Sequence, residues 1–223
     1  MLLVFDCDGV VVDSMLLHNE IEARVLRTAG INILPEELRR RFAGVAMSSI
    51  CKILEQETGR TISPEIEATM EREKIATFRQ QLQPIAGVGA ALDALSDFPR
   101  CIASGSKESE VTAALETVGL YDRFAPHIFS TERVEHGKPA PDLFLLAARH
   151  VGIPAQDCLV IEDGVAGVLA GVAAGMTVFG FVGGSHCGPN HSDKLRQAGA
   201  ETVFSNMQDL PRLARAHALK ATS

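Results

Sequence analysis

Acidic side chains that could do chemistry follow two short apolar runs. Asp6 and Asp8 come directly after the apolar residues 2–5, and Glu162 and Asp163 come directly after a second such run. No basic residue lies beside Glu162 and Asp163, so two carboxylates there would be costly without a cation. Oxygen ligands in this small number suit Mg²⁺, and no cluster of His and Cys ligands competes in these loops. The residues therefore predict a Mg²⁺ ion between Glu162, Asp163 and Asp6.

Asp6 and Asp8 stand two positions apart on an extended segment, so both point to one side while Cys7 points into the core. A carboxylate beside Mg²⁺ stays ionised and could attack phosphorus. Its neighbour could give a proton to the leaving oxygen and later take one from water. Gly9 allows the tight turn that leaves room for these groups. The pair therefore indicates phosphoryl transfer.

Two further segments offer groups that could hold a phosphoryl anion. Lys138 lies in a proline-stiffened loop before a predicted helix, where a fixed ammonium could neutralise a phosphoryl oxygen. Ser104 and the backbone amides after it, beginning at Gly105, precede another predicted helix and form a second anion cradle.

Alternating strands and helices must position these residues. Short apolar runs predict strands buried on both faces: Leu2 to Phe5, Cys101 to Ala103, His127 to Phe129, Cys158 to Ile161, Thr177 to Val182 and Thr202 to Phe204. Stretches of helical length lie between the later ones: Lys107 to Val118, Ala140 to Val151, Val165 to Ala174 and His191 to Ala198. This order predicts an α/β fold with a doubly wound parallel sheet, whose ligands bind at the carboxyl ends of the strands.

Residues 13–83 do not continue this alternation of strands and helices, because they contain several helical stretches and no convincing strand. We therefore expect two domains, a Rossmann-like core of residues 1–14 and 84–223 and an α-helical insertion of residues 15–83. Asp13 to Leu16 and Pro84 to Gly89 would form the hinge between them.

Composition excludes several classes of protein. The 223 residues carry 28 acidic and 21 basic side chains, a formal net charge of -7, which argues against nucleic acid as a partner. Five widely spaced cysteines indicate buried thiols in a reducing compartment. Without a signal-peptide pattern, the cytoplasm is the predicted location. The uncharged stretch of residues 164–184 could span a membrane by length, but its seven glycines favour a buried helix and strand, so we expect no membrane partner.

Four segments together resemble the motifs of the haloacid dehalogenase superfamily. They are Phe5-Asp6-Cys7-Asp8-Gly9-Val10 to Asp13-Ser14, then Ser104, Lys138 and Glu162-Asp163. The helical insertion resembles the cap of the subfamily that contains β-phosphoglucomutase and small sugar-phosphate phosphatases. The resemblance implies hydrolysis of a small phosphorylated metabolite, with a sugar or sugar-acid phosphate as the expected class and a monomer as the default state.

The resemblance also implies roles for the motif residues. Asp6 would be the nucleophile that forms an aspartyl phosphate, and Asp8 the general acid and base. Mg²⁺ would be held by the Asp6 carboxylate, the Asp8 main-chain carbonyl and Asp163, with Glu162 acting through water or indirect contacts. Ser104 and Lys138 would bind the transferring phosphoryl group, together with the amide of Gly105.

Departures from the family pattern bear on specificity. His18 stands where β-phosphoglucomutase has a cap histidine, and Ser106 and Lys107 resemble part of its site for a distal phosphate. Met47 replaces the cap arginine of that enzyme, which favours hydrolysis over mutase action. His18 and Lys107 could also be ordinary surface or capping residues. Gly44 is a further expected neighbour of the substrate.

Gly164 replaces the Ser or Asn that often follows the last motif aspartate, which could weaken metal binding. Asp13 and Ser14 are predicted to cap the first inserted helix.

Three alternatives stay open. The chain could be a phosphosugar mutase, or a module that binds a phosphorylated metabolite without catalysis. In a glycine-rich loop, His186, Cys187 and His191 could bind a soft metal, although their spacing matches no standard pattern and favours an ordinary loop.

Overall fold

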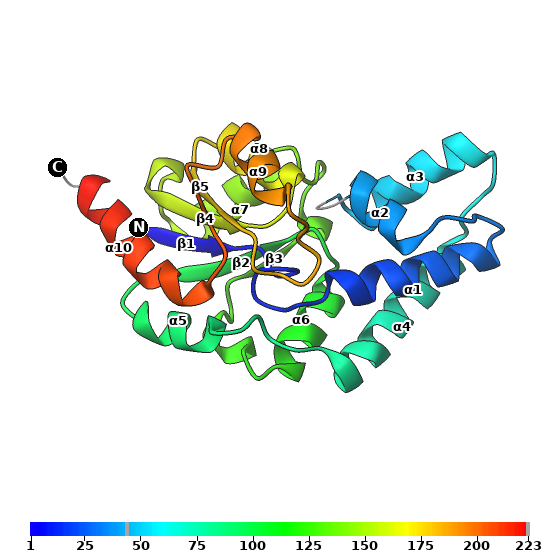
Figure 1. Ribbon diagram of the computed structural model, residues 1–223, viewed down its shortest axis with the longest axis horizontal. Helices are drawn as coiled ribbons and strands as arrows, with labels where there is room; N and C mark the ends of the chain where they lie inside the picture. The colour runs from blue at the N-terminus through cyan, green and yellow to red at the C-terminus, as the bar shows by residue number, and fades with distance from the viewer. Residues whose placement is uncertain (43–44, 222–223) are drawn as a thin grey trace.

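A six-stranded, all-parallel sheet is the centre of the computed structural model, which describes residues 1–42 and 45–221 (Figure 1). The strand order is β3-β2-β1-β4-β5-β6. The strands are β1 (Leu2–Phe5), β2 (Arg100–Ser104), β3 (Ile128–Ser130), β4 (Cys158–Glu162), β5 (Thr177–Phe181) and β6 (Thr202–Phe204). Each coincides with a predicted apolar run to within one residue at either end. The predicted doubly wound α/β fold is therefore confirmed.

Helices cover both faces of this sheet because the strands are apolar on both sides. In β1, Leu3 and Phe5 pack into one buried cluster, and Leu2 and Val4 pack into the other. The first cluster is covered by α5 (Val88–Ala94), α6 (Glu108–Thr117) and α10 (Leu210–Ala221). The second is covered by α7 (Asp142–Val151), α8 (Val165–Ala173) and α9 (His191–Gln197). Four short 3₁₀ helices complete this part: η1 (Tyr121–Arg123), η2 (Thr131–Arg133), η3 (Ala155–Asp157) and η4 (Met207–Asp209).

Two of these helices differ from the sequence expectation. α5 begins inside the segment predicted to be a hinge, and α10 was not predicted at all. α10 is anchored by Leu210 and Ala214, which are fully buried four positions apart and cover the sheet.

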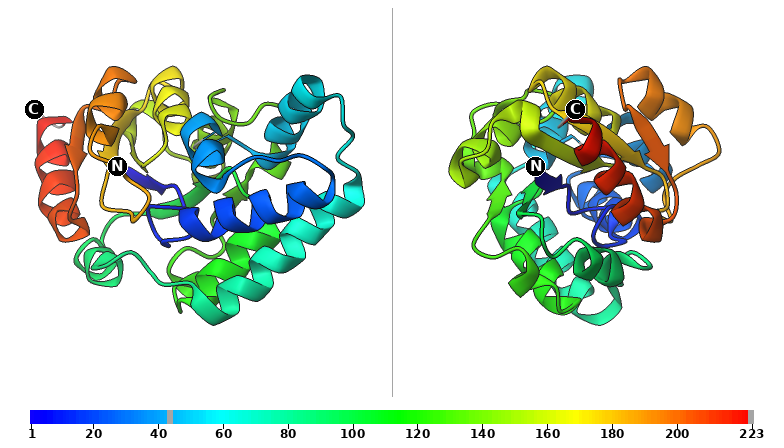
Figure 2. Two further views of the ribbon diagram at one scale, coloured as in Figure 1. Left: turned by 45° about the vertical axis from the view of Figure 1, so that its right-hand side comes forward. Right: turned by 90° about the vertical axis from the view of Figure 1, so that its left-hand side faces the viewer.

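Four helices gather beyond the carboxyl ends of the strands, away from the N-terminus and α10 (Figures 1 and 2). They are α1 (Met15–Thr28), α2 (Pro35–Phe42), α3 (Met47–Thr58) and α4 (Pro64–Gln81). They share a third buried cluster, and α4 also packs along α6. Between residues 15 and 83, the described part of the chain contains no strand, as predicted.

The chain leaves and re-enters the sheet part at adjacent points. The amide of Asp13 donates to the carbonyl of Gln83, and the amide of Ile85 donates to the carbonyl of Val11, both at 2.9 Å. The two predicted crossings therefore lie side by side and connect the helices α1 to α4 to the sheet.

The uncharged stretch of residues 164–184 forms a helix, α8, and a strand, β5, and is not one continuous helix. Its glycines let helix and sheet approach closely, since a Cβ atom on Gly171 would lie 2.6 Å from Val178 Cγ2. Among the described residues, no helix combines the length and apolar character of a membrane span.

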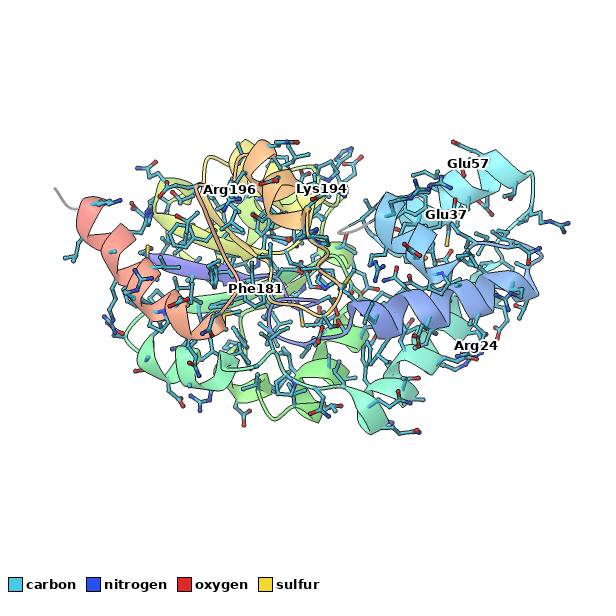
Figure 3. The ribbon with its side chains drawn as sticks, in the orientation of Figure 1. Arg24, Glu37, Glu57, Phe181, Lys194 and Arg196 are labelled. Carbon is cyan, nitrogen blue, oxygen red and sulfur yellow. The ribbon has the colours of Figure 1, made fainter. Side chains whose placement is uncertain are left out.

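Charged side chains gather on the outside of the fold, as Arg24, Glu37 and Glu57 show on α1 to α3, while Phe181 points into the sheet core (Figure 3). All five cysteines are free thiols, and only Cys187 is partly exposed. The prediction of buried thiols therefore holds for the other four.

Candidate active site

A tight turn after β1 brings Asp6 and Asp8 to the carboxyl edge of the sheet. The amide of Asp6 still bonds to Ile161 of β4 at 2.9 Å, and Cys7 is fully buried behind it. Gly9 has a φ angle of +84°, and a Cβ atom there would lie 2.0 Å from Asp163 Oδ2. Only glycine fits this position, because both the backbone conformation and the space exclude a side chain.

A buried lysine joins two of the predicted carboxylates. Lys138 Nζ donates to Asp6 Oδ1 at 2.7 Å and to Glu162 Oε1 at 2.6 Å, and its side chain is 2% exposed. Burial lowers the pKa of Lys138, but the charges of Asp6 and Glu162 outweigh this effect and raise it. Burial also raises the pKa of both Asp6 and Glu162, although Lys138 opposes the shift. One ammonium therefore does not balance the carboxylates around it.

Asp163 completes this acidic group. One carboxylate oxygen from each of Asp6, Glu162 and Asp163 lies within 4.8 Å of the others, and all three residues are buried. Glu162 Oε2 also accepts a hydrogen bond of 2.7 Å from the amide of Gly164. Three buried oxygen ligands short of positive charge fit a hard divalent cation such as Mg²⁺.

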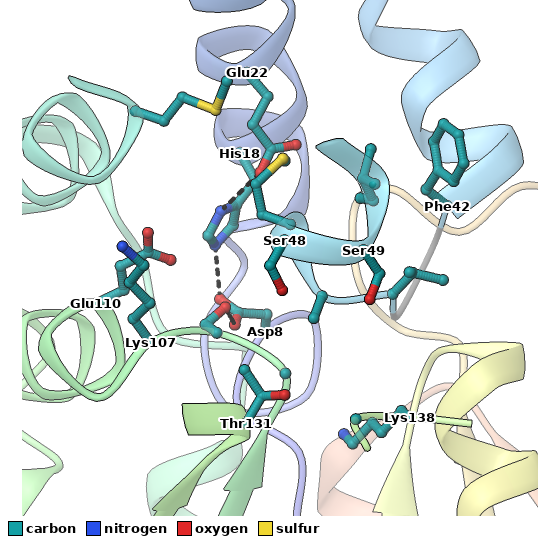
Figure 4. Close-up of a pocket in the computed structure, with 18 of the residues that line it drawn as sticks. Asp8, His18, Glu22, Phe42, Ser48, Ser49, Lys107, Glu110, Thr131 and Lys138 are labelled. Atoms are coloured by element: carbon teal, nitrogen blue, oxygen red, sulfur yellow. Dashed lines mark hydrogen bonds and ion pairs between the residues drawn. The ribbon is translucent and has the colours of Figure 1, made fainter. Parts of the chain in front are cut away.

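Asp8 is held by a separate network of hydrogen bonds, of which Figure 4 shows the contact with His18. Oδ1 accepts from Ser14 Oγ at 2.6 Å and lies 2.9 Å from His18 Nε2, while Oδ2 accepts from Ser106 Oγ at 2.7 Å. Burial raises the pKa of Asp8, but the charge of His18 and these bonds hold it well below its usual range. Burial lowers the pKa of His18, yet Asp8 raises it to about 9. At neutral pH the pair is a carboxylate and an imidazolium.

The prediction that Asp13 and Ser14 cap α1 is wrong for their side chains. Ser14 occupies the cap position, but its hydroxyl bonds Asp8 and makes no capping bond. Asp13 Oδ1 instead accepts from the amide and the hydroxyl of Ser185. Both side chains therefore bond to other segments at the site, Ser14 to Asp8 and Asp13 to Ser185, instead of capping the helix.

A cavity of about 310 Å³ lies between the carboxyl edge of the sheet and the helices α1 to α4. Among the predicted site residues, those that line it are Asp6, Asp8, His18, Met47, Gly105, Ser106, Lys107, Lys138 and Asp163. Ser104 and Glu162 are buried beneath this surface, and Ser104 Oγ is 3.4 Å from Asp8 Oδ2. Gly44 lies outside the described residues.

A buried charge network that was not among the predicted groups lies in the same cavity. Lys74 Nζ lies 2.8 Å from Glu22 Oε1 and 3.6 Å from Glu110 Oε1, and these residues come from α4, α1 and α6. The sequence does contain a signal for this network, because Lys74 stands midway between the buried residues Met70 and Phe78 on one face of α4. A charge in the middle of such an apolar stripe predicts a buried partner of opposite charge.

Lys107, at the start of α6, reaches across to α4. Its Nζ donates to Glu71 Oε2 at 2.8 Å, and Ser109 donates to the other oxygen of that carboxylate at 2.5 Å. Lys107 therefore belongs to the contact between the sheet part and the helices α1 to α4 as well as to the cavity wall.

Three side chains from the segment after β5 lie close together beside Asp163. His186 Nε2 lies 2.8 Å from Asp163 Oδ2 and 3.4 Å from Cys187 Sγ, and His191 Nε2 lies 2.5 Å from the main-chain oxygen of Asp163. Burial raises the pKa of Cys187, but its bonds to the two histidines outweigh this and lower it. The structure therefore brings together the three residues that the sequence allowed as a soft-metal site, although their spacing favoured an ordinary loop.

Comparison with known proteins agrees with this geometry. Residues 1–175 match the family described as haloacid dehalogenase-like hydrolases. The chain belongs to this family. The match includes all four motifs, from Asp6 to Asp163, and places this hydrolase among enzymes.

Several relatives of this haloacid dehalogenase-like hydrolase are named phosphatases. It is 30% identical over 220 residues to 6-phosphogluconate phosphatase from Escherichia coli, covering 98% of this chain and 96% of that protein. It is 33% identical over 179 residues to hexitol phosphatase A from the same organism, covering 78% and 80%.

Solved structures show the same fold. A haloacid dehalogenase-like protein of unknown function from Agrobacterium tumefaciens is 41% identical, with a TM-score of 0.81 and coverage of 97% and 98%. A putative β-phosphoglucomutase from Thermotoga maritima is 25% identical, with a TM-score of 0.70 and coverage of 96% and 98%. The predicted family is therefore confirmed.

Proposed function

We propose that this haloacid dehalogenase-like hydrolase is a Mg²⁺-dependent phosphatase that acts on a small phosphomonoester by way of an aspartyl phosphate on Asp6. One observation carries the proposal. The Asp6 carboxylate lines the cavity and lies beside Lys138, with Glu162 and Asp163 within reach of a shared cation. This arrangement joins a nucleophile, a fixed positive charge and a metal-binding group at one point.

The Mg²⁺ ion would be held by the carboxylates of Asp6 and Asp163 and the main-chain carbonyl of Asp8, with Glu162 supporting through water. When bound, it would neutralise phosphoryl charge and keep Asp6 ionised. Lys138 would hold a phosphoryl oxygen in addition to orienting Asp6.

The chain's own residues provide the remaining steps. The amide of Gly105 would bind a further phosphoryl oxygen, and Ser104, whose hydroxyl accepts from the amide of Ser106 at 3.0 Å, would support this turn from beneath. Because His18 holds the proton of the Asp8–His18 pair, we propose that this pair together protonates the leaving oxygen. Asp8 would then accept a proton from the water that cleaves the aspartyl phosphate. The bonds from Ser14 and Ser106 keep Asp8 turned toward the cavity.

A sugar or sugar-acid phosphate fits the cavity best. The wall of the cavity that α1, α3 and α4 form contains hydroxyl, amide and charged groups that can bond to a polyhydroxyl chain. They are Asn19, Glu22, Ser48, Ser49, Lys52 and Lys74. Relatives are named for 6-phosphogluconate, hexitol and fructose 1-phosphate, which are substrates of this kind.

We further propose that residues 15–83 act as a cap that closes over the substrate and excludes water during attack on phosphorus. The cavity lies between these helices and the sheet, and the two crossings at Asp13 and Pro84 are adjacent, as a hinge requires. Changes at these crossings should therefore alter turnover.

Phosphate release from phosphorylated sugars, sugar acids, nucleotides and a chromogenic monoester tests the proposal, with Mg²⁺ or EDTA present. Release should require Mg²⁺ and be lost in Asp6→Asn. Near wild-type turnover by Asp6→Asn would remove Asp6 as the nucleophile. Conversion of a phosphosugar to its isomer without free phosphate would establish a mutase, which Met47 argues against. Binding without either reaction would favour a metabolite-binding module.

The sequence also predicts a monomer in the cytoplasm. Size-exclusion chromatography with light scattering tests the first of these, and fractionation of cells tests the second.

A further inference from the structure

The loop between β5 and α9 brings one thiol and two imidazoles together beside Asp163. The ligand atoms of His186, Cys187 and His191 all lie within 4.8 Å of one another. Cys187 Sγ is 3.4 Å from His186 Nε2. On a tetrahedral Zn²⁺ ion, with bonds of about 2.3 Å to sulfur and about 2.0 Å to nitrogen, two such ligands stand about 3.5 Å apart. This pair already has the separation that zinc requires.

Both imidazole rings are fixed in place. His191 Nε2 lies 2.5 Å from the main-chain oxygen of Asp163, so it donates its N–H there and leaves the lone pair on Nδ1 for a metal. A bond of this kind from the second ring nitrogen is typical of histidines that bind metal. The His186 side chain is 2% exposed, and its ring packs edge-on against that of His191. Cys187 and His191 are partly exposed, which leaves an ion a way in from solvent.

Asp163 lies between two groups of ligands. Its Oδ2 is 2.8 Å from His186 Nε2, and one of its oxygens also belongs to the group formed with Asp6 and Glu162. Because Asp163 is far from residues 186–191 in the sequence, spacing alone could not indicate a fourth ligand. One thiolate, two neutral imidazoles and one carboxylate make a four-ligand set that balances the charge of Zn²⁺.

We propose that His186, Cys187, His191 and Asp163 form a site for a soft divalent ion such as Zn²⁺, and that this ion withdraws Asp163 from the Mg²⁺ group and stops phosphate release. Binding forms a zinc–sulfur bond, releases the thiol proton of Cys187 and the imidazolium proton of His186 to solvent, and changes no oxidation state. The existence of the site depends on geometry alone. The effect on phosphate release rests on the proposed function.

Co²⁺ titration of the full chain, freed of bound metal and without thiol reductant, tests the site itself. A near-ultraviolet absorption from thiolate bound to cobalt should appear in the wild type and be absent in Cys187→Ser. Cys158→Ser is the matched control, because Cys158 Sγ bonds the carbonyl of Pro154 at 3.3 Å and serine can make the same bond. This control should keep the absorption. Absence of the cobalt absorption from the wild type, or its persistence in Cys187→Ser, would refute the proposed site.

Competition for Asp163 needs a second measurement. Calorimetric titration with Mg²⁺ should show at least about tenfold weaker binding when one equivalent of Zn²⁺ is present. Cys187→Ser and His191→Gln should each largely restore it. Phosphate release at fixed Mg²⁺, with each protein's rate without zinc as its own reference, should need about tenfold more Zn²⁺ for half-inhibition in these variants.

The outcomes separate the two proposals. If the cobalt absorption depends on Cys187 but zinc weakens Mg²⁺ binding equally in the wild type and Cys187→Ser, zinc acts at Asp6 and the proposed competition is wrong. If the wild type releases no phosphate from any substrate, the proposed function fails. Cobalt absorption and Mg²⁺ calorimetry still decide the zinc site in that case.

Discussion

Replacing Lys74 by methionine tests the buried charge network that links α4 to α1 and α6. Its ammonium faces Glu22 at 2.8 Å and Glu110 at 3.6 Å, and the three side chains are 4%, 10% and 6% exposed. Removing one partner of a buried ion pair costs about 3–5 kcal/mol, because the remaining charge is left buried and unpaired. His18 Nδ1 stays 3.8 Å from Glu22, so we expect the lower end, about 3 kcal/mol.

Urea unfolding and thermal melting measure this loss. For a protein of this size, about 3 kcal/mol lowers Tm by about 6–12 °C. Arg72→Met is the matched control on the same helix, since Arg72 pairs only with solvent-exposed groups such as Glu65. It should change stability by less than about 0.5 kcal/mol. Glu22→Gln combined with Lys74→Met should recover part of the loss, because it removes the buried charge left behind.

The loss in free energy of unfolding caused by Lys74→Met should also depend on pH. Burial raises the pKa of Glu22, but Lys74 and His18 outweigh this and hold it below its ordinary value of 4.5. In the wild type, Glu22 therefore contributes stability above pH 4.5 that is lost as the pH falls. Without Lys74 this carboxyl is readily protonated, so the difference between the two proteins should shrink from pH 7.5 to pH 4.5. A loss below about 1 kcal/mol at pH 7.5, or a difference that does not vary with pH, would refute the reasoning.

Three further predictions concern the site. Asp163→Asn should raise the Mg²⁺ concentration for half-maximal phosphate release by about tenfold or more, and an unchanged requirement would remove Asp163 from the ligands. Gly167→Ala should destabilise by about 1–3 kcal/mol in urea unfolding and reduce turnover, because the new Cβ would lie 1.6 Å from Glu162 Oε1. Wild-type stability should fall from pH 6.5 to pH 9 as His18 loses its proton, and His18→Gln should reduce that fall by up to about 3 kcal/mol, as measured by unfolding at both values.

The sheet and the meeting of the acidic groups could be predicted because both depend on local pattern. A strand buried on both faces is a continuous apolar run, as β4 is, and parallel strands necessarily bring their carboxyl ends to one edge. The polar residues after β1 and β4 therefore had to meet, whatever the helices did.

Contacts that depend on how helices pack could not be predicted in this way. Lys74 is buried only because α1, α4 and α6 converge on it, and no spacing within α4 specifies those partners. Ser14 looks like a helix cap in sequence, yet Asp8 offers its hydroxyl a buried, charged acceptor that a capping bond cannot match. α10 shows a third cause, since Leu210 and Ala214 are too sparse an apolar pattern to predict a helix that only the sheet stabilises.

The charged groups at the bottom of the cavity form two separate sets. Asp8 faces His18, whose pKa is raised to about 9, so this pair carries no net charge at neutral pH. The pair can hold one proton for the leaving oxygen without changing the net charge near the position where the phosphate binds. Changes to this pair should therefore affect proton transfer more than binding of the phosphoryl group.

The second set is short of positive charge. It contains the three carboxyl groups of Asp6, Glu162 and Asp163 but only two basic groups, Lys138 and His186, whose pKa its bond to Asp163 raises to about 10 despite burial. Carboxyl groups therefore outnumber basic groups, and an excess of negative sign repels a phosphomonoester dianion at the point where it must bind. A divalent cation changes that sign, so the site should bind Mg²⁺ before substrate. Burial is the main cause of the raised pKa of Asp6 and Glu162, and the neighbouring carboxylates add to it while Lys138 opposes it.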